Sequence, residues 1–269
     1  MNRSLEIHAQ MKLAIENVQK ADIFVQCFQH MKTFTDSINV TFQEDNMFIQ
    51  CMDPTMVLIM EFKLPASWFD MYEVREPIVI GLTTSIWAKV LAIRDKSQNI
   101  QLSTEDREDY LSVMYHVEDS KTVFDKSFEV PLISIDTDLL QIPEMEYPAD
   151  IVLPSITFAS MISQLKQFGD NMHIECTEEH VQMVSDSEIY GRMNTHIPID
   201  DLEEFAIDEG KTIKCSLGLR MLHNVCSYQK IAKTIALGVS DTYPMKIEYK
   251  MDDDAILVFY LAPRVNDDD

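Results

Sequence analysis

Two stretches of the sequence share one pattern of apolar residues: FVQCFQHMKTF at Phe24–Phe34 and FASMISQLKQF at Phe158–Phe168. In both, apolar side chains recur three and four positions apart, which is the spacing of one face of an amphipathic helix. A shift of 134 residues superposes the two stretches, and the same shift places Asp36 on Asp170. Because the match extends beyond the helix, it indicates two copies of one unit of about 130 residues, too long for a solenoid repeat.

The remaining segments extend this pattern over each copy. The four predicted helices are Asp22–Phe34, Thr84–Arg94, Ser155–Phe168 and Gly218–Ile231, with Asp22 and Ser155 as predicted N-caps. Twelve segments alternate with period two: Lys12–Val18, Met47–Met52, Val57–Leu64, Ile78–Leu82, Tyr110–Val117, Val123–Val130, Met172–Cys176, Val181–Ser185, Thr212–Leu217, Thr234–Val239, Met245–Lys250 and Ala255–Leu261. Such strands are typical of antiparallel sheets with one buried face. The sequence therefore predicts an α+β protein with two duplicated domains, each of antiparallel strands and two helices.

The composition is that of an acidic globular protein. Of 269 residues, 22 are Lys or Arg and 45 are Asp or Glu, which gives a net charge of -23. If this negative charge is spread evenly over the surface, it argues against nucleic acid or an anionic membrane as a partner. We expect no membrane span and no signal peptide, since no long apolar run occurs and the first residues lack a basic and then apolar pattern. Five cysteines without a CxxC pair indicate a reducing, cytosolic or nuclear compartment.

Motifs for catalysis are missing, and we expect no enzyme activity, no cofactor and no metal. Gly210-Lys211-Thr212 resembles the end of a phosphate-binding loop, but Phe205 stands where that loop requires its first glycine. The acidic runs are Asp200-Asp201, Glu203-Glu204, Asp252-Asp253-Asp254 and Asp267-Asp268-Asp269. They lie at predicted turns and at the end of the chain, where solvated loops explain them. A metal-dependent nuclease that uses these acids remains an alternative.

The basic charge is concentrated in the predicted helices. They contain one acid, Asp22, where the average density of the chain would give about nine. They hold six basic residues, namely Lys32, Lys89, Arg94, Lys166, Arg220 and Lys230. Helices packed on both sides would also lack acids, but they would equally lack bases. We therefore predict a surface that faces a polyanion, because phosphate backbones attract Lys and Arg and repel Asp and Glu.

Several short motifs resemble one known family. The most specific is Ile247-Glu248-Tyr249-Lys250 followed by FYLAPRV at Phe259–Val265. Met52-Asp53, Phe69-Asp70-x-Tyr72, LSTED at Leu102–Asp106 and Ile142-Pro143-Glu144 also have the family's spacing. Over about residues 12–266 the chain resembles the DNA sliding clamps of the eukaryotic proliferating cell nuclear antigen type.

This resemblance implies a homotrimeric ring of six similar domains, with helices inside and sheets outside. Such a clamp encircles double-stranded DNA without reading its sequence. It tethers a DNA polymerase and other PIP-box proteins as a processivity factor in replication and repair, and it needs a separate ATP-driven clamp loader. The expected location is the nucleus, or a viral replication site if the protein is encoded by a virus. The expected organisation is an N-terminal extension (1–11), domain 1 (12–132), an interdomain connector (133–147), domain 2 (148–265) and an acidic tail (266–269).

The resemblance also implies two protein-binding surfaces. The family's partner-peptide pocket corresponds to Met52, Met56, Ile59, Leu140, Ile142, Pro244, Tyr260, Leu261, Ala262 and Pro263. The subunit interface would join the Val123–Val130 edge to the Val181–Ser185 edge of a neighbour. Its expected residues are Ile93, Val123, Phe124, Phe128, Leu165, Phe168, Val181 and Met183.

The sequence departs from the family at several positions. Val25, Gln26, Ala92, Ser160 and Ser163 stand where the family usually has inner Lys or Arg, so a weakly basic channel is expected. Glu178 occupies the place of the family's modified lysine. These changes leave open an alternative: a processivity factor that works as a monomer or dimer, or one subunit of a hetero-oligomeric, checkpoint-like ring.

Overall fold

The protein, seen here in a computed structural model that describes residues 9–105 and 109–264, divides into two compact units. Unit 1 is built from the described parts of Met1–Cys51, Phe62–Leu139 and Asp252–Ala255. Unit 2 is built from the described parts of Met52–Glu61, Leu140–Met251 and Ile256–Asp269. The units therefore follow the two halves of the chain, except that each includes one short segment from the other half.

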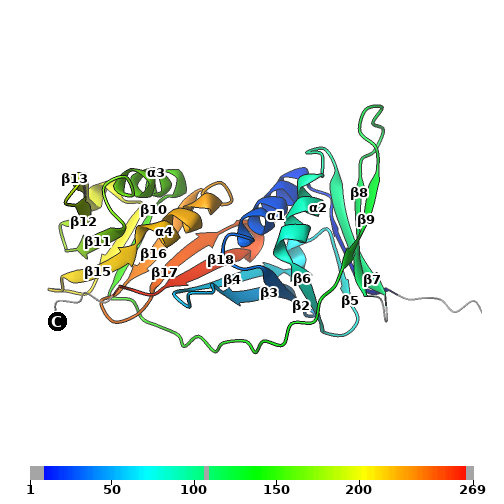
Figure 1. The fold of residues 1–269 in the computed structure, drawn as a ribbon, viewed down its shortest axis with the longest axis horizontal. Helices are drawn as coiled ribbons and strands as arrows, with labels where there is room; N and C mark the ends of the chain where they lie inside the picture. The colour runs from blue at the N-terminus through cyan, green and yellow to red at the C-terminus, as the bar shows by residue number, and fades with distance from the viewer. Residues whose placement is uncertain (1–8, 106–108, 265–269) are drawn as a thin grey trace, which may run out of the picture. The chain divides into compact units, whose positions relative to one another are not determined.

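The first half supplies strands and helices in the order predicted for one copy (Figure 1). The elements are β1 (Ala9–Ile15), α1 (Val18–Met31), β2 (Ser37–Phe42), β3 (Asn46–Met52), β4 (Leu58–Pro65), the 3-10 turn η1 (Ala66–Trp68), β5 (Met71–Val74), β6 (Ile78–Thr83), α2 (Thr84–Ala92), β7 (Asn99–Glu105), β8 (Tyr110–His116) and β9 (Lys126–Pro131). One antiparallel sheet has the order β5-β1-β7-β8-β9, and β3, β2 and β6 pair antiparallel in another. Strand β9 lies at the edge of the first sheet.

The second half repeats this arrangement. Its elements are β10 (Ala149–Pro154), α3 (Ser155–Leu165), β11 (Asn171–Cys176), β12 (His180–Ser187), β13 (Gly191–Pro198), η2 (Ile199–Asp201), β14 (Glu204–Ile207), β15 (Ile213–Gly218), α4 (Leu219–Val225), η3 (Cys226–Tyr228), β16 (Thr234–Val239), β17 (Met245–Lys250), η4 (Asp252–Asp254) and β18 (Ile256–Leu261). Its sheets have the orders β13-β12-β11-β15 and β14-β10-β16-β17-β18. The predicted α+β fold of two duplicated copies is confirmed.

One contact shows how closely the copies match. The Tyr115 hydroxyl on β8 donates to the Val90 carbonyl of α2 at 3.0 Å. The Tyr249 hydroxyl on β17 donates to the Val225 carbonyl of α4 at 3.1 Å. The two tyrosines are 134 residues apart and the two valines 135. The same buried hydrogen bond therefore holds the second helix of each copy, and it explains the tyrosine of the Glu248-Tyr249-Lys250 motif.

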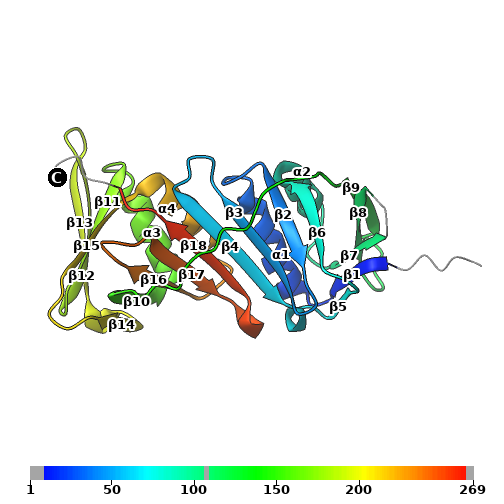
Figure 2. The ribbon, with the colours of Figure 1, turned by 90° about the horizontal axis from the view of Figure 1, so that it is seen from below.

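The helices in each unit lie side by side and bury one face (Figures 1 and 2). In unit 1, Phe24 and Phe28 of α1 pack with the Trp87 ring of α2 at centroid distances of 6.5 and 5.7 Å. In unit 2, the ring centroids of Tyr228 on η3 and Phe259 on β18 lie 5.4 Å apart. Burial of each such ring contributes roughly 1.5–3 kcal/mol, so the helical spacing seen in the sequence becomes the core of each unit.

Several predicted boundaries are wrong. Helix α1 begins a turn earlier than predicted because Asn17, not Asp22, is its N-cap: the Asn17 Oδ1 atom accepts from the Gln19 and Lys20 amides. Ser155 is the first residue of α3, with Pro154 at the cap position. Helix α4 is shorter than predicted and continues as the turn η3. Strand β1 begins at Ala9, inside the predicted N-terminal extension.

Six strands were not predicted: β5 and β14 have four residues each and β13 has few apolar ones, but β2 and β7 do alternate with period two. The six are β2, β5, β7, β10, β13 and β14. Asp106, Val265 and the acidic tail lie outside the described residues. In the described part of the chain, no helix has the length and apolar character needed to cross a membrane.

Candidate DNA, partner and subunit surfaces

Five of the six predicted DNA-binding cations are exposed at or just after the helices. In unit 1, Lys32 is the C-cap of α1 and Lys89 lies on α2. In unit 2, Lys166 is the C-cap of α3, Arg220 lies on α4 and Lys230 follows η3. Within residues 9–105 and 109–264, none of these five side chains forms an ion pair. Their charges are therefore available to an external anion.

Histidines on the same helices stay neutral near these cations. Burial, and then the nearby Lys32, lower the pKa of His30 on α1. Burial, and then Lys166, lower the pKa of His223 on α4. At neutral pH these side chains can donate hydrogen bonds, and the positive charge of the helices comes from Lys and Arg alone.

Arg94 is the exception, and its assignment to the DNA surface is corrected here. Its side chain is only 2% exposed, and the Nη1 atom lies 2.7 Å from Oδ1 of Asp22 on α1. The Nε atom donates to the Gln98 carbonyl at 2.7 Å. Arg94 therefore neutralises the one acid of the helices and ties α2 to α1, so it is not free to bind phosphate.

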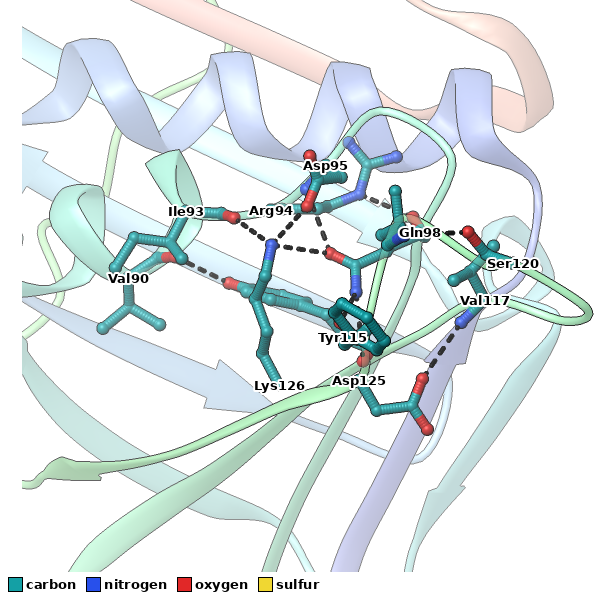
Figure 3. Close-up of polar contacts among 12 residues, drawn as sticks. Val90, Ile93, Arg94, Asp95, Gln98, Tyr115, Val117, Ser120, Asp125 and Lys126 are labelled. Atoms are coloured by element: carbon teal, nitrogen blue, oxygen red, sulfur yellow. Dashed lines mark hydrogen bonds and ion pairs between the residues drawn. The ribbon is translucent and has the colours of Figure 1, made fainter.

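A buried glutamine, Gln98, organises the end of α2 and the start of β9 (Figure 3). Its Oε1 atom accepts from the Asp95 amide at 3.0 Å and from Lys126 Nζ at 3.2 Å. Its Nε2 atom donates to the Phe124 carbonyl at 2.9 Å and the Tyr115 carbonyl at 3.5 Å. Because the amide uses all its hydrogen-bonding capacity, it fixes the segment that leads into the edge strand.

Lys126 completes this network. Its ammonium group donates to the Ile93 carbonyl at 2.8 Å and forms an ion pair with Asp95. Sequence reasoning missed the network, since a lone Gln in a polar loop carries no signal that it is buried.

The predicted subunit residues fall into two groups. Phe124 is 71% exposed and Ile93 49%, while Val123, Phe128 and Phe168 are half-buried. Leu165, Val181 and Met183 are each 0% exposed, so they belong to the core of this chain and cannot contact a neighbour.

The predicted acceptor edge is also corrected. Strand β12, which contains Val181–Ser185, is paired on both sides, with β11 and with β13. The edge strands of that sheet are β13 and β15, and the one beside β12 is β13, whose residues are half-buried and exposed in alternation. The weak apolar pattern of β13 is the reason that it escaped the sequence analysis.

The predicted partner residues that lie on the β3–β4 turn are held by a buried carboxylate. Asp53 is 3% exposed, and its Oδ1 atom accepts from the Val57 and Leu58 amides at 2.9 and 2.7 Å. Its Oδ2 atom accepts from the Thr55 amide at 2.9 Å. Burial would raise the pKa of Asp53, but the hydrogen bonds from Thr55, Leu58 and Val57 together lower it. The turn gives Met56 a positive φ of 59° and leaves its side chain 74% exposed.

The other predicted partner residues gather in unit 2 around the connector. The Ala262 amide donates to the Val57 carbonyl at 2.8 Å, which places the C-terminal Ala262-Pro263 segment beside the Met56 turn. Met52 is 37% and Leu140 44% exposed, whereas Ile59, Ile142, Pro244, Tyr260, Ala262 and Pro263 are half-buried. Leu261 is only 1% exposed and is removed from the predicted pocket, because it points into the core.

Two hollows flank the connector in unit 2. One, of about 590 Å³, is lined by Glu61, Lys246, Tyr260 and the Ile142–Tyr147 segment. The other, of about 690 Å³, is lined by Pro143–Pro148 together with residues from the β14–β15 and β16–β17 turns. Of the predicted pocket residues, Ile142 and Tyr260 line the first hollow.

The described acidic runs belong to separate elements. Asp200 and Asp201 lie in η2, and Asp252–Asp254 form η4. In the described part of the chain, no three His, Cys, Asp or Glu side chains are placed to share a metal ion. Glu178, at the place of the family's modified lysine, accepts from the Gly210 amide at 2.8 Å.

Two copies of a unit with antiparallel sheets and a pair of acid-poor helices define the sliding-clamp class of proteins. Comparison with family models agrees: the proliferating cell nuclear antigen N-terminal domain matches residues 14–139, and the C-terminal domain matches residues 141–264. The chain therefore belongs to the proliferating cell nuclear antigen family.

Curated relatives are similar over almost the whole chain. The proliferating cell nuclear antigen of Chaetomium thermophilum is 25% identical over 257 residues, which cover 94% of this chain and 98% of the relative. That of Saccharomyces cerevisiae is 22% identical over 255 residues, covering 93% and 98%. The chain is thus a divergent sliding clamp with a processivity role in DNA replication and repair, and it is a scaffold without enzymatic activity.

Proposed function

We propose that the protein closes as a homotrimeric ring around double-stranded DNA and tethers a DNA polymerase and other PIP-box proteins to it. A separate ATP-driven loader opens the ring. The protein acts in the nucleus, or at a viral replication site if a virus encodes it.

The observation that carries this proposal is the exposure of the cations on and just after the helices. Lys32, Lys89, Lys166, Arg220 and Lys230 are exposed and, within the described residues, form no ion pair. The one acid of α1–α4, Asp22, forms an ion pair with Arg94. The chain as a whole has a net charge of -23. A set of exposed and unpaired cations in such an acidic protein is explained if these cations bind an anion.

Two free sheet edges support assembly into a ring. Strand β9 ends one sheet and β13 ends another, and each half of the chain contributes one of them. Edge strands with unpaired backbone groups add further strands readily. Pairing of β9 with β13 of the next copy would use up both edges, and a closed ring leaves neither exposed.

The partner surface is proposed in unit 2. Tyr260 lines one hollow beside the connector, and the exposed Met52 and Met56 lie at the β3–β4 turn, next to Ala262. Flexible methionines and an aromatic ring suit the apolar side chains of different peptides.

Native mass in solution tests the ring first. Three copies of the 31.1 kDa chain would give a species near 93.3 kDa. A mass of 31.1 or 62.2 kDa would instead favour the monomeric, dimeric or hetero-oligomeric alternative.

The DNA surface is tested by the double variant Lys89→Ala, Arg220→Ala. Each lost phosphate contact should reduce the salt slope of DNA binding by roughly one, while the native mass stays unchanged. The matched control is Lys12→Ala, Lys63→Ala, which removes the same charge from exposed strand positions. Equal salt slopes for both double variants would show that the helices are not the DNA surface.

A further inference from the structure

Two glycines inside strands mark where the connector, residues 133–147, touches the rest of the protein. The chain has only 6 glycines. Gly81 lies within β6 and Gly238 within β16. Glycine weakens a strand interior and often marks a place where another backbone or ring comes very close.

The N-terminal end of the connector is fixed in unit 1. The Ile133 amide donates to the Gly81 carbonyl at 2.9 Å, and Asn39 Nδ2 donates to the Ile135 carbonyl at 3.1 Å. A Cβ atom on residue 81 would lie 2.1 Å from the Ile133 carbonyl oxygen. The chain here passes on the side of β2 and β6 that faces away from α1 and α2 (Figures 1 and 2).

The C-terminal end of the connector is fixed in unit 2 by an aromatic ring. The Tyr147 ring lies on Gly238, where a Cβ atom would come within 2.6 Å of Tyr147 Cγ. The Tyr147 hydroxyl donates to the Pro244 carbonyl at 3.0 Å. Burial, and then the nearby Tyr260 and Asp150, raise the pKa of Tyr147 to about 12, so the hydroxyl keeps its proton.

Between these anchors the connector presents apolar side chains to solvent. Leu139 is 56% exposed and Leu140 44%. In unit 2 the Pro143–Tyr147 segment forms a wall shared by the two hollows of about 590 and 690 Å³. Tyr147 therefore sits where a small shift of the wall changes the width of both hollows.

We propose that the contact of Tyr147 with Gly238 positions the connector wall of the partner-peptide pocket, that is, the Ile142–Tyr147 segment that lines the hollow of about 590 Å³. The Tyr147 ring contacts the Gly238 backbone directly, because glycine has no side chain. This contact sets how close the connector wall lies to β16 and β17. This inference rests on the proposed partner-binding function. Tyr147 acts through the connector, by holding Ile142 and Pro143 at the rim.

A double-mutant cycle tests the proposal. Gly238→Ala should push the ring out and weaken binding of a fluorescein-labelled PIP-box peptide by about tenfold, as expected when a preorganised surface is loosened. Tyr147→Ala should weaken it similarly. Because both changes break one contact, the double variant should bind like either single variant. Fully additive losses, or normal binding by Gly238→Ala, would overturn the proposal.

Two further variants separate positioning from stability. Tyr147→Phe keeps the ring and loses one hydrogen bond, so it should bind within about threefold of the unchanged protein. Gly218→Ala is the matched control, since a Cβ atom there meets nothing closer than 3.4 Å. The Tyr147 variants also answer the question if Gly238→Ala does not fold.

Hydrogen exchange of the full chain gives a readout that needs no peptide. In Gly238→Ala the amides of 142–148 should exchange faster, whereas those of 133–136 at the other anchor should not change. If the unchanged protein binds no peptide, the proposed partner function fails while this exchange pattern still supports the anchor. Unchanged exchange rates in 142–148 would show that Tyr147 and Gly238 do not fix this end of the connector.

Discussion

At the scale of single residues, the environment of a charge decides its role more than its position in a pattern does. Arg94 and Lys89 are near neighbours at the end of α2, and both belong to the basic set found in the sequence. Lys89 is exposed, whereas the Arg94 guanidinium is buried against Asp22 and the Gln98 carbonyl. A planar guanidinium can satisfy several acceptors at once, which suits it to this internal position.

Asp53 illustrates the same point for a carboxylate and predicts a pH dependence. Replacing Asp53 by Asn should lower the free energy of unfolding at pH 7 by about 1–2 kcal/mol, because hydrogen bonds to a charged acceptor are lost. The pKa of Asp53 is lowered in the folded protein, so its contribution is complete above the ordinary value of 3.8 and is lost as the pH falls through the folded pKa.

Urea unfolding of both proteins from pH 7 to pH 3 measures this effect. The difference between them should stay constant down to about pH 5 and shrink below about pH 4. A difference that grows on acidification would contradict the assigned hydrogen bonds. Partner-peptide binding should weaken in Asp53→Asn as well, since the Met56 turn depends on this carboxylate.

At the scale of elements, the duplication preserves contacts as well as the order of strands and helices. Helices α2 and α4 share little sequence. In each copy, however, a tyrosine on the second strand after the helix donates a hydrogen bond to a carbonyl group of that helix. Burial raises the pKa of the Tyr249 hydroxyl far above its usual range, so the hydroxyl remains a donor.

The paired contact predicts paired effects. Tyr115→Phe and Tyr249→Phe should each reduce the free energy of unfolding by about 0.5–1.5 kcal/mol, since each removes one hydrogen bond of a buried tyrosine hydroxyl. Chemical denaturation of the two single variants compares the effects directly. Tyr243→Phe is a suitable control, because Tyr243 is 45% exposed and its loss should be near zero. Strongly unequal losses from the two positions would show that the copies have diverged at this contact.

At the scale of the whole molecule, the edge strands and the aromatic side chain beside β9 matter most. Gln98 fixes the Phe124 carbonyl while the Phe124 ring remains 71% exposed. A large exposed ring on a well-fixed backbone is typical of a protein contact site. This agrees with the proposal that β9 joins a second copy.

Phe124→Asp should therefore disrupt assembly without unfolding the chain. We expect the native mass to shift toward the single chain at micromolar concentration, because an aspartate would be buried without a partner in the interface. Light scattering across a dilution series measures this shift, and thermal unfolding checks the fold. Met114→Asp is the control, since Met114 is 44% exposed on β8, a strand that is paired on both sides. Equal masses for the variant, its control and the unchanged protein would exclude Phe124 from the interface.

The sequence alone determined the repeated unit, the helices and the concentration of basic charge on them, because these depend on local spacing and composition. The helical stripe of Phe24 and Phe28 recurs at 158 and 162 and forms the core of both units. Only the tertiary structure decided which members of these sets face outward. It buried Arg94, Leu165, Val181, Met183 and Leu261, and it made β13, not β12, an edge strand. It also showed the hydrogen bonds of Gln98 to residues 17 and 26 positions away and the contact of Tyr147 with Gly238, in which residues far apart in the sequence meet. Burial and sheet order depend on which distant segments pack together, and a local pattern holds no record of that packing.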